Sequence, residues 1–138
     1  MIDLNSTLDE LNNFNDNTLM SQLGIEYLEI ADGFVKAKMP VDHRTMQPMG
    51  ILHGGASLAL AETIGSMGSA LMVDLSKFDV RGASISANHV GSIREGFVYG
   101  NAKLVHKGKY THVWDIVITD ENERRISISR LTNMIIKK

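Results

Sequence analysis

The chain has 138 residues, of which 43% are hydrophobic and 22% are charged, and its formal net charge is −2. These values are typical of one ordinary globular domain that is large enough to bury a core. A charge this close to neutral gives no general attraction to nucleic acid or to anionic membranes. Because the chain contains no cysteine, disulfides, thiol nucleophiles and thiolate metal sites are excluded.

The N-terminal region predicts neither a signal peptide nor a membrane anchor. Its first twenty residues carry four acidic side chains and no Lys or Arg. No uncharged apolar run approaches the roughly 18 to 20 residues of a membrane span. We therefore expect a cytoplasmic protein with a single domain over residues 1–138, in which 1–24 form short helices packed on the rest.

Two short helices are expected first. Thr7 and Glu10 have the spacing of a capping box, and a second helix is predicted from Asn17 to Gly24. Two strands, Ile25–Ile30 and Phe34–Met39, then read as a hairpin closed by Ala31-Asp32-Gly33.

A loop from Pro40 to Gly50 leads to a long predicted helix over Ala56–Leu71, in which Glu62 is the only charge. A polar connection, Asp74–Asp79, follows. Four more strands are predicted over Arg81–Val90, Gly96–Lys107, Tyr110–Thr119 and Arg125–Ile136. Short turns at 107–109 and 120–123 make the last strands antiparallel neighbours. One long helix with such a sheet predicts an α+β fold whose sheet covers the helix.

The chemistry centres on this helix. The N–H groups of Gly54 and Gly55 lie where the helix begins, where they have no intrahelical partner and suit a developing negative charge on a carbonyl oxygen. Glu62 is an isolated carboxylate among apolar and small residues. Together these features indicate an acyl-transfer or hydrolytic enzyme.

Helix geometry separates the two features. Gly54 and Glu62 are eight residues apart, which is about 12 Å along a helix axis. One carbonyl group cannot touch both, since catalytic contacts are about 3 Å long. Either the features serve different purposes, or Glu62 of one copy meets Gly54 of another across a two-fold axis. We favour the dimer.

The segment from Met39 to Met67 resembles the hotdog-fold acyl-CoA thioesterases, and most closely the PaaI-like branch with the dihydroxynaphthoyl-CoA thioesterases of menaquinone synthesis. The resemblance rests on Met39-Pro40-Val41-Asp42, Arg44-Thr45, Gln47-Pro48, Gly50, Leu52-His53-Gly54-Gly55-Ala56-Ser57, Leu60-Ala61-Glu62-Thr63 and Gly65-Ser66-Met67. It implies a hotdog fold, a long central helix wrapped by a curved antiparallel sheet, assembled as a dimer of dimers. It also implies an acyl-CoA substrate and no separate cofactor.

The same resemblance assigns five catalytic residues. Glu62 would act as general base or as nucleophile, and the Gly54 N–H would polarise the thioester carbonyl. Gln47 and His53 would orient the carbonyl and the thiol leaving group, and Ser66 would help to position the water or Glu62.

Further residues correspond to substrate and CoA contacts of the family. They are Gly55, Gly82, His89, Val90, Gly91, Ser92, His106, Lys107, Gly108, Lys109, Tyr110 and Thr111. Close relatives carry a basic residue and a proline after the equivalent of His89, where this chain has Val90-Gly91-Ser92.

Purely structural roles are alternatives to these catalytic and binding roles. His53 also suits a helix cap, Gly54-Gly55 an entry turn, and Lys107 and Lys109 solvated turn charges. The five histidines never have the spacing of a local metal motif, so we predict no metal.

Two other functions also stay open. A hotdog dehydratase or hydratase pairs a His with an acid, but Gln47-x5-His53-Gly54-Gly55 favours hydrolysis. A non-catalytic acyl-CoA sensor would carry an added DNA-binding segment, and the acidic stretch before Ile25 is too short for one.

Overall fold

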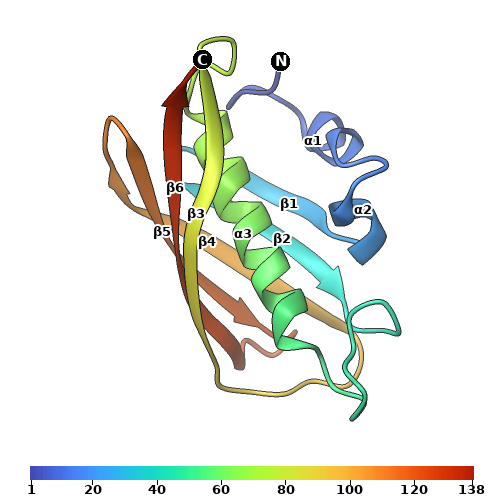
Figure 1. Cartoon of the computed structure of the whole chain (residues 1–138). Coiled ribbons are helices and arrows are strands. Elements are labelled where there is room, and N and C mark those ends of the chain that lie inside the picture. Colours follow the sequence, from blue (N-terminus) through green and yellow to red (C-terminus); the bar gives the residue numbers. More distant parts are fainter.

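The computed structural model describes residues 1–138 as a curved antiparallel sheet around one long helix (Figure 1). The helices are α1 (Leu8–Phe14), α2 (Leu19–Leu23) and α3 (Gly54–Leu71). The strands are β1 (Glu26–Ala31), β2 (Phe34–Pro40), β3 (Phe78–His89), β4 (Phe97–Lys107), β5 (Thr111–Thr119) and β6 (Arg125–Lys137). The six strands lie in the order β1-β2-β4-β5-β6-β3. The predicted α+β hotdog fold is therefore confirmed.

The core lies between α3 and the concave face of the sheet. Alternation along β5 buries Trp114, Ile116 and Ile118 against the helix. The helix approaches closely because it carries glycine where the sheet touches it. A Cβ atom at Gly68 would lie 2.6 Å from Cζ2 of Trp114, and one at Gly65 would lie 2.6 Å from a methyl carbon of Leu131.

Strand β3 forms one edge of the sheet. It pairs with β6 along its whole length and not with β4, its neighbour in the chain. The strand begins at Phe78, whereas the sequence predicted Arg81. The prediction of a polar connection up to Asp79 was wrong at its end, because Phe78 and Asp79 pair with Lys137 and Ile136. The predicted antiparallel neighbours β4, β5 and β6 are confirmed.

The N-terminal helices lie beside β1 and α3, as Figure 1 shows in blue. The predicted capping box at Thr7 is present, with the Glu10 N–H donating to Thr7 Oγ1 at 3.2 Å. Helix α2 is capped by Thr18 and not by Asn17, whose φ of 59° is outside the helical region. Gly24 ends α2 at φ 71°, as predicted. No helix is both long and apolar enough to cross a membrane.

Candidate active site

The N-terminus of α3 combines a cap with a free donor. His53 precedes the helix, and its Nδ1 accepts a hydrogen bond from the Gly55 N–H at 2.7 Å. The Gly55 donor is thus used within the chain, while the Gly54 N–H has no partner in it. Because Nδ1 accepts, neutral His53 carries its proton on Nε2 and can donate from there. The helix therefore offers Gly54 N–H and His53 Nε2–H to a ligand.

Gln47 approaches the same end of α3 from a tight turn. Its backbone carbonyl accepts from the Gly50 N–H at 2.9 Å, and its side-chain oxygen accepts from the Met49 N–H. Since this bond holds the amide oxygen, the Gln47 side-chain NH₂ is left as a donor. Gln47 and Gly54 line a pocket of about 450 Å³ together with His89.

The ring of His89 lies against the first turn of α3. A Cβ atom at Gly54 would lie 2.6 Å from His89 Nε2, so a larger residue here would displace the imidazole ring. On the other side of the ring, His89 Nδ1 is 3.1 Å from Ser127 Oγ. Val90, Gly91 and Ser92 continue the wall of the same pocket.

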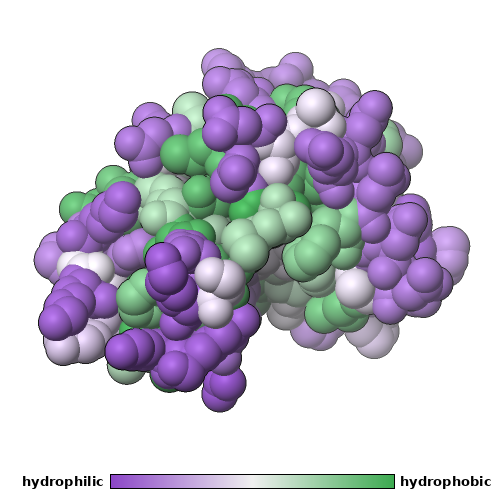
Figure 2. All heavy atoms as spheres, turned by 90° about the horizontal axis from the view of Figure 1, so that it is seen from above, coloured by the Kyte–Doolittle hydropathy of each residue, from purple (hydrophilic) through white to green (hydrophobic).

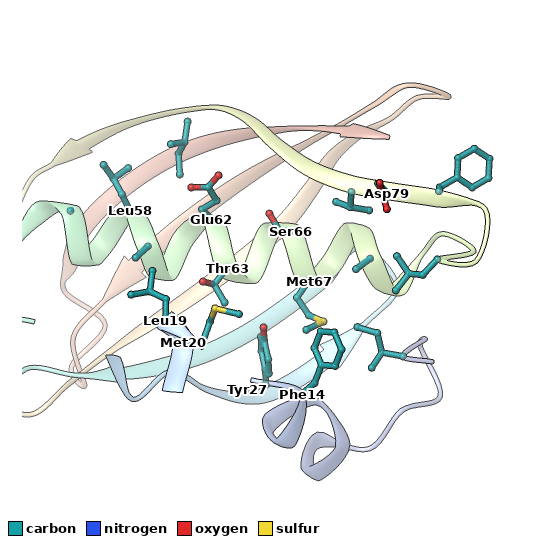
Figure 3. Close-up of a pocket in the computed structure, with 18 of the residues that line it drawn as sticks. Phe14, Leu19, Met20, Tyr27, Leu58, Glu62, Thr63, Ser66, Met67 and Asp79 are labelled. Atoms are coloured by element: carbon teal, nitrogen blue, oxygen red, sulfur yellow. The ribbon is translucent and has the colours of Figure 1, made fainter. Parts of the chain in front are cut away.

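Glu62 lies farther along α3 and faces β3 (Figure 3). Its side chain is exposed in the single chain and borders a second, larger cavity. The carboxylate packs on the backbone of Gly82, where a Cβ atom would overlap its Oε1. Gly82 therefore leaves room for Glu62, a role that the sequence did not suggest.

Ser66 shares the side of α3 that carries Glu62, whereas Thr63 and Met67 project the other way (Figure 3). This agrees with the four-residue spacing of Glu62 and Ser66. Ser66 is half-buried and its Oγ bonds to Asn133 Oδ1 on β6 at 3.2 Å.

The larger cavity has a volume of about 780 Å³ and is lined mainly by apolar side chains. Phe14, Leu19, Met20 and Tyr27 form its N-terminal wall opposite α3 (Figure 3). From above, apolar surface lines the hollow in the molecule and hydrophilic side chains surround it (Figure 2). Burial raises the pKa of the Tyr27 hydroxyl well above its usual range, so that it stays protonated. No local pattern in the sequence indicates Tyr27, since its place in the cavity wall depends on how α1 and α2 fold back.

The predicted CoA contacts lie near the two opposite ends of helix α3. His89 to Ser92 border the pocket at the first residue of α3. Lys109 and Tyr110, from the turn between β4 and β5, line a pocket with Met72, which directly follows α3. The helix has 18 residues, and therefore extends over about 27 Å. One chain does not bring these two sets together, and the same is true of Gly54 and Glu62, which remain two turns apart on a regular helix.

His, Asp and Glu side chains form no group of three or more arranged to hold a metal ion. Catalysis without a metal or other cofactor stays a prediction.

Residues 49–127 match the thioesterase superfamily. The chain is 46% identical over 129 residues to the proofreading thioesterase EntH of Cronobacter turicensis, which covers 94% of this chain and 93% of that protein. A mutant of thioesterase PA1618 from Pseudomonas aeruginosa has a similar structure, with a TM-score of 0.94 and 40% identity over 97% of this chain and 96% of that chain. A mutant of thioesterase SAV0944 from Staphylococcus aureus has a TM-score of 0.84 and 42% identity, covering 86% of this chain and 98% of that chain.

Proposed function

The chain belongs to the thioesterase superfamily and is a thioester hydrolase, and from this premise we propose that it hydrolyses an acyl-CoA at a site built by two copies of the chain. Glu62 of one copy acts on the thioester carbonyl, while Gly54, His53 and Gln47 of the other bind that carbonyl and the leaving thiol. Solved variants of the Staphylococcus aureus relative replace a glutamine and a glutamate separated by 15 positions. Gln47 and Glu62 have the same separation, which supports their pairing in one site.

The observation that carries the two-copy proposal is the distance along α3. About 12 Å of helix separates the Gly54 N–H from Glu62, and the two predicted sets of CoA contacts lie at opposite ends of that helix. A two-fold dimer that sets two α3 helices side by side in opposite directions removes both problems at once, and creates two equivalent sites. We further propose that two such dimers form the homotetramer.

The hydrolytic step balances without a cofactor. As general base, Glu62 takes a proton from water while the water oxygen bonds to the carbonyl carbon. The Gly54 N–H stabilises the resulting oxyanion. Collapse breaks the C–S bond, and Glu62 returns the proton to the CoA thiolate. As nucleophile, Glu62 would instead bond to the carbonyl carbon and expel the CoA thiolate, which breaks the C–S bond. Water would then attack the Glu62 carboxyl carbon of the anhydride, release the acid and leave a proton for the thiolate. Single turnover in H₂¹⁸O separates the routes, since the nucleophilic route transfers label to Glu62.

The acyl group is proposed to be aromatic or of medium chain length. The cavity beside Glu62 is apolar and holds about 780 Å³, and the protonated Tyr27 hydroxyl offers a polar contact in its wall. Dihydroxynaphthoyl-CoA is the first aromatic substrate to test, because of the resemblance to the menaquinone-pathway branch.

The experiment is thiol release from a panel of aromatic and aliphatic acyl-CoAs, followed with a thiol reagent. Glu62→Gln keeps the side-chain shape and is expected to lower kcat by about 10² to 10⁴. Glu121→Gln removes an exposed carboxylate that lines a separate pocket and serves as the matched control. Full activity of Glu62→Gln would refute the assignment.

A mixed dimer tests the shared site. When Glu62→Gln and Gln47→Ala copies are combined, a site drawn from two copies leaves one of two sites intact. A site drawn from one copy leaves none. Recovery of activity in the purified mixed dimer is therefore expected, and its absence would contradict the two-copy proposal.

The alternatives give other outcomes in the same assay. A dehydratase or hydratase would convert the acyl chain without releasing thiol. A non-catalytic sensor would bind acyl-CoA tightly and leave it intact.

A further inference from the structure

A buried chain of hydrogen bonds leads from Ser66 into the sheet. Ser66 Oγ lies 3.2 Å from Asn133 Oδ1, and Asn133 is 0% exposed. The Asn133 amide nitrogen donates to the Gly65 carbonyl at 3.1 Å and to Ser69 Oγ at 2.9 Å. Reversing the amide would bring two carbonyl oxygens together at Gly65, so these partners determine which atom faces Ser66.

Ser69 stabilises this orientation of the Asn133 amide. Its Oγ accepts from Asn133 Nδ2 and also from Trp114 Nε1 at 2.9 Å. A hydroxyl accepts two hydrogen bonds and donates one, so the Ser69 hydrogen goes to His112 Nδ1, 3.0 Å away. Burial lowers the pKa of His112, with a smaller effect from Lys107 and then His106. Neutral His112 can accept at Nδ1, so both lone pairs and the hydrogen of the Ser69 hydroxyl have partners.

The network determines what Ser66 presents to the cavity. Asn133 Oδ1 can accept but cannot donate, so the hydrogen of the Ser66 hydroxyl points toward the sheet. The lone pairs of Ser66 Oγ are therefore left for the cavity that Ser66 and Glu62 both line. Toward a ligand, Ser66 is an acceptor.

We propose that Asn133 is a positioning residue that acts through Ser66 to orient the attacking water. This inference rests on the proposed function. Side chains four apart on a helix are about 5–6 Å apart at Cβ, and a water about 2.8 Å from each oxygen fits between them. One water hydrogen then points to Glu62 and the other to Ser66 Oγ, which leaves an oxygen lone pair for the thioester carbon.

The test is a double-mutant cycle on kcat and KM, with the acyl-CoA found in the panel. Asn133→Ala and Ser66→Ala are each expected to lower kcat about ten- to hundredfold with little change in KM. The double variant is expected to match Ser66→Ala within about twofold, because Asn133 has no route to the water except through Ser66. If the two effects multiply, Asn133 acts on folding or packing in general and the proposal is wrong.

Two further variants keep the test decisive. Asn133→Asp retains the oxygen that accepts from Ser66, and burial favours the protonated carboxyl, whose O–H can replace the amide N–H that faces the Gly65 carbonyl. Its kcat is therefore expected to stay well above that of Ser66→Ala. A folded Asn133→Asp enzyme with a kcat as low as that of Ser66→Ala overturns the proposal even if Asn133→Ala does not fold. Ser129 is on the same strand as Asn133, and its buried hydroxyl has no hydrogen-bond partner. Ser129→Ala is therefore expected to leave kcat unchanged. Failure of the proposed function looks different: the wild type would release no thiol, or Glu62→Gln would retain full activity.

Discussion

Replacing Gly82 by alanine tests whether the observed place of the Glu62 carboxylate is the catalytic one. The new methyl carbon would overlap Glu62 Oε1 and lie 3.1 Å from Glu62 Cδ. Ordinary contact between carbon atoms is about 3.5–4.0 Å. The carboxylate must therefore withdraw by roughly 0.5–1 Å, and a misplacement of about 1 Å can cost up to 10²-fold in rate. We expect Gly82→Ala to lower kcat about ten- to hundredfold.

Stability should hardly change, because the clash falls on the end of an exposed, flexible side chain. Gly82 is itself exposed on an edge strand, and its φ is not among the positive values. Thiol release measures the loss of kcat, and thermal unfolding measures stability. In a Glu62→Ala background the Gly82 change should have no further effect. A Gly82→Ala enzyme with full kcat, or one that loses stability in place of kcat, would refute the reasoning.

Three other changes have distinct expected outcomes. Gly68→Ala places a methyl group 2.6 Å from Cζ2 of buried Trp114, and such overpacking lowers the free energy of unfolding by about 1–3 kcal/mol. The melting temperature should therefore fall, while kcat measured below the melting temperature should stay unchanged. His53→Ala removes the acceptor for the Gly55 N–H, and the loss of a helix cap lowers the free energy of unfolding by about 0.5–2 kcal/mol. His53→Asn can still cap the helix, so it should restore the melting temperature. It should not restore the rate, because asparagine lacks the Nε2–H group. The pKa of His112 is lowered in the folded protein from its ordinary 6.5, so His112 takes up a proton on unfolding below about pH 6.5. The melting temperature should therefore be highest above about pH 6.5 and fall as the pH drops. This fall should be less steep in His112→Gln.

Much of the fold was readable from local pattern. The α3 helix follows from a proline-free run of small and apolar residues, and the capping box at Thr7 from three-residue spacing. The start of β3 was missed because Phe78 and Asp79 lie in a polar stretch, and only pairing with the distant residues Ile136 and Lys137 makes them a strand.

The same distinction between local and long-range information applies to the candidate active site. Gln47, His53 and Glu62 lie in one segment whose spacing carries the signal. Asn133 is 67 residues from Ser66, and the contact between them depends on how β6 is placed against α3. No local sequence pattern indicates this placement, so the sequence did not predict a role for Asn133.

The position of β6 has a consequence for biosynthesis. The strand that lies between β5 and β3 is the last of the six to be made. Until Arg125–Lys137 leave the ribosome, β3 has no partner and its backbone groups stay unpaired. The nascent chain can form α3 and the β1-β2-β4-β5 half early, but the sheet is complete only after β6 has been made. Folding through such distant pairing is slow, and during this interval the nascent chain needs protection from aggregation.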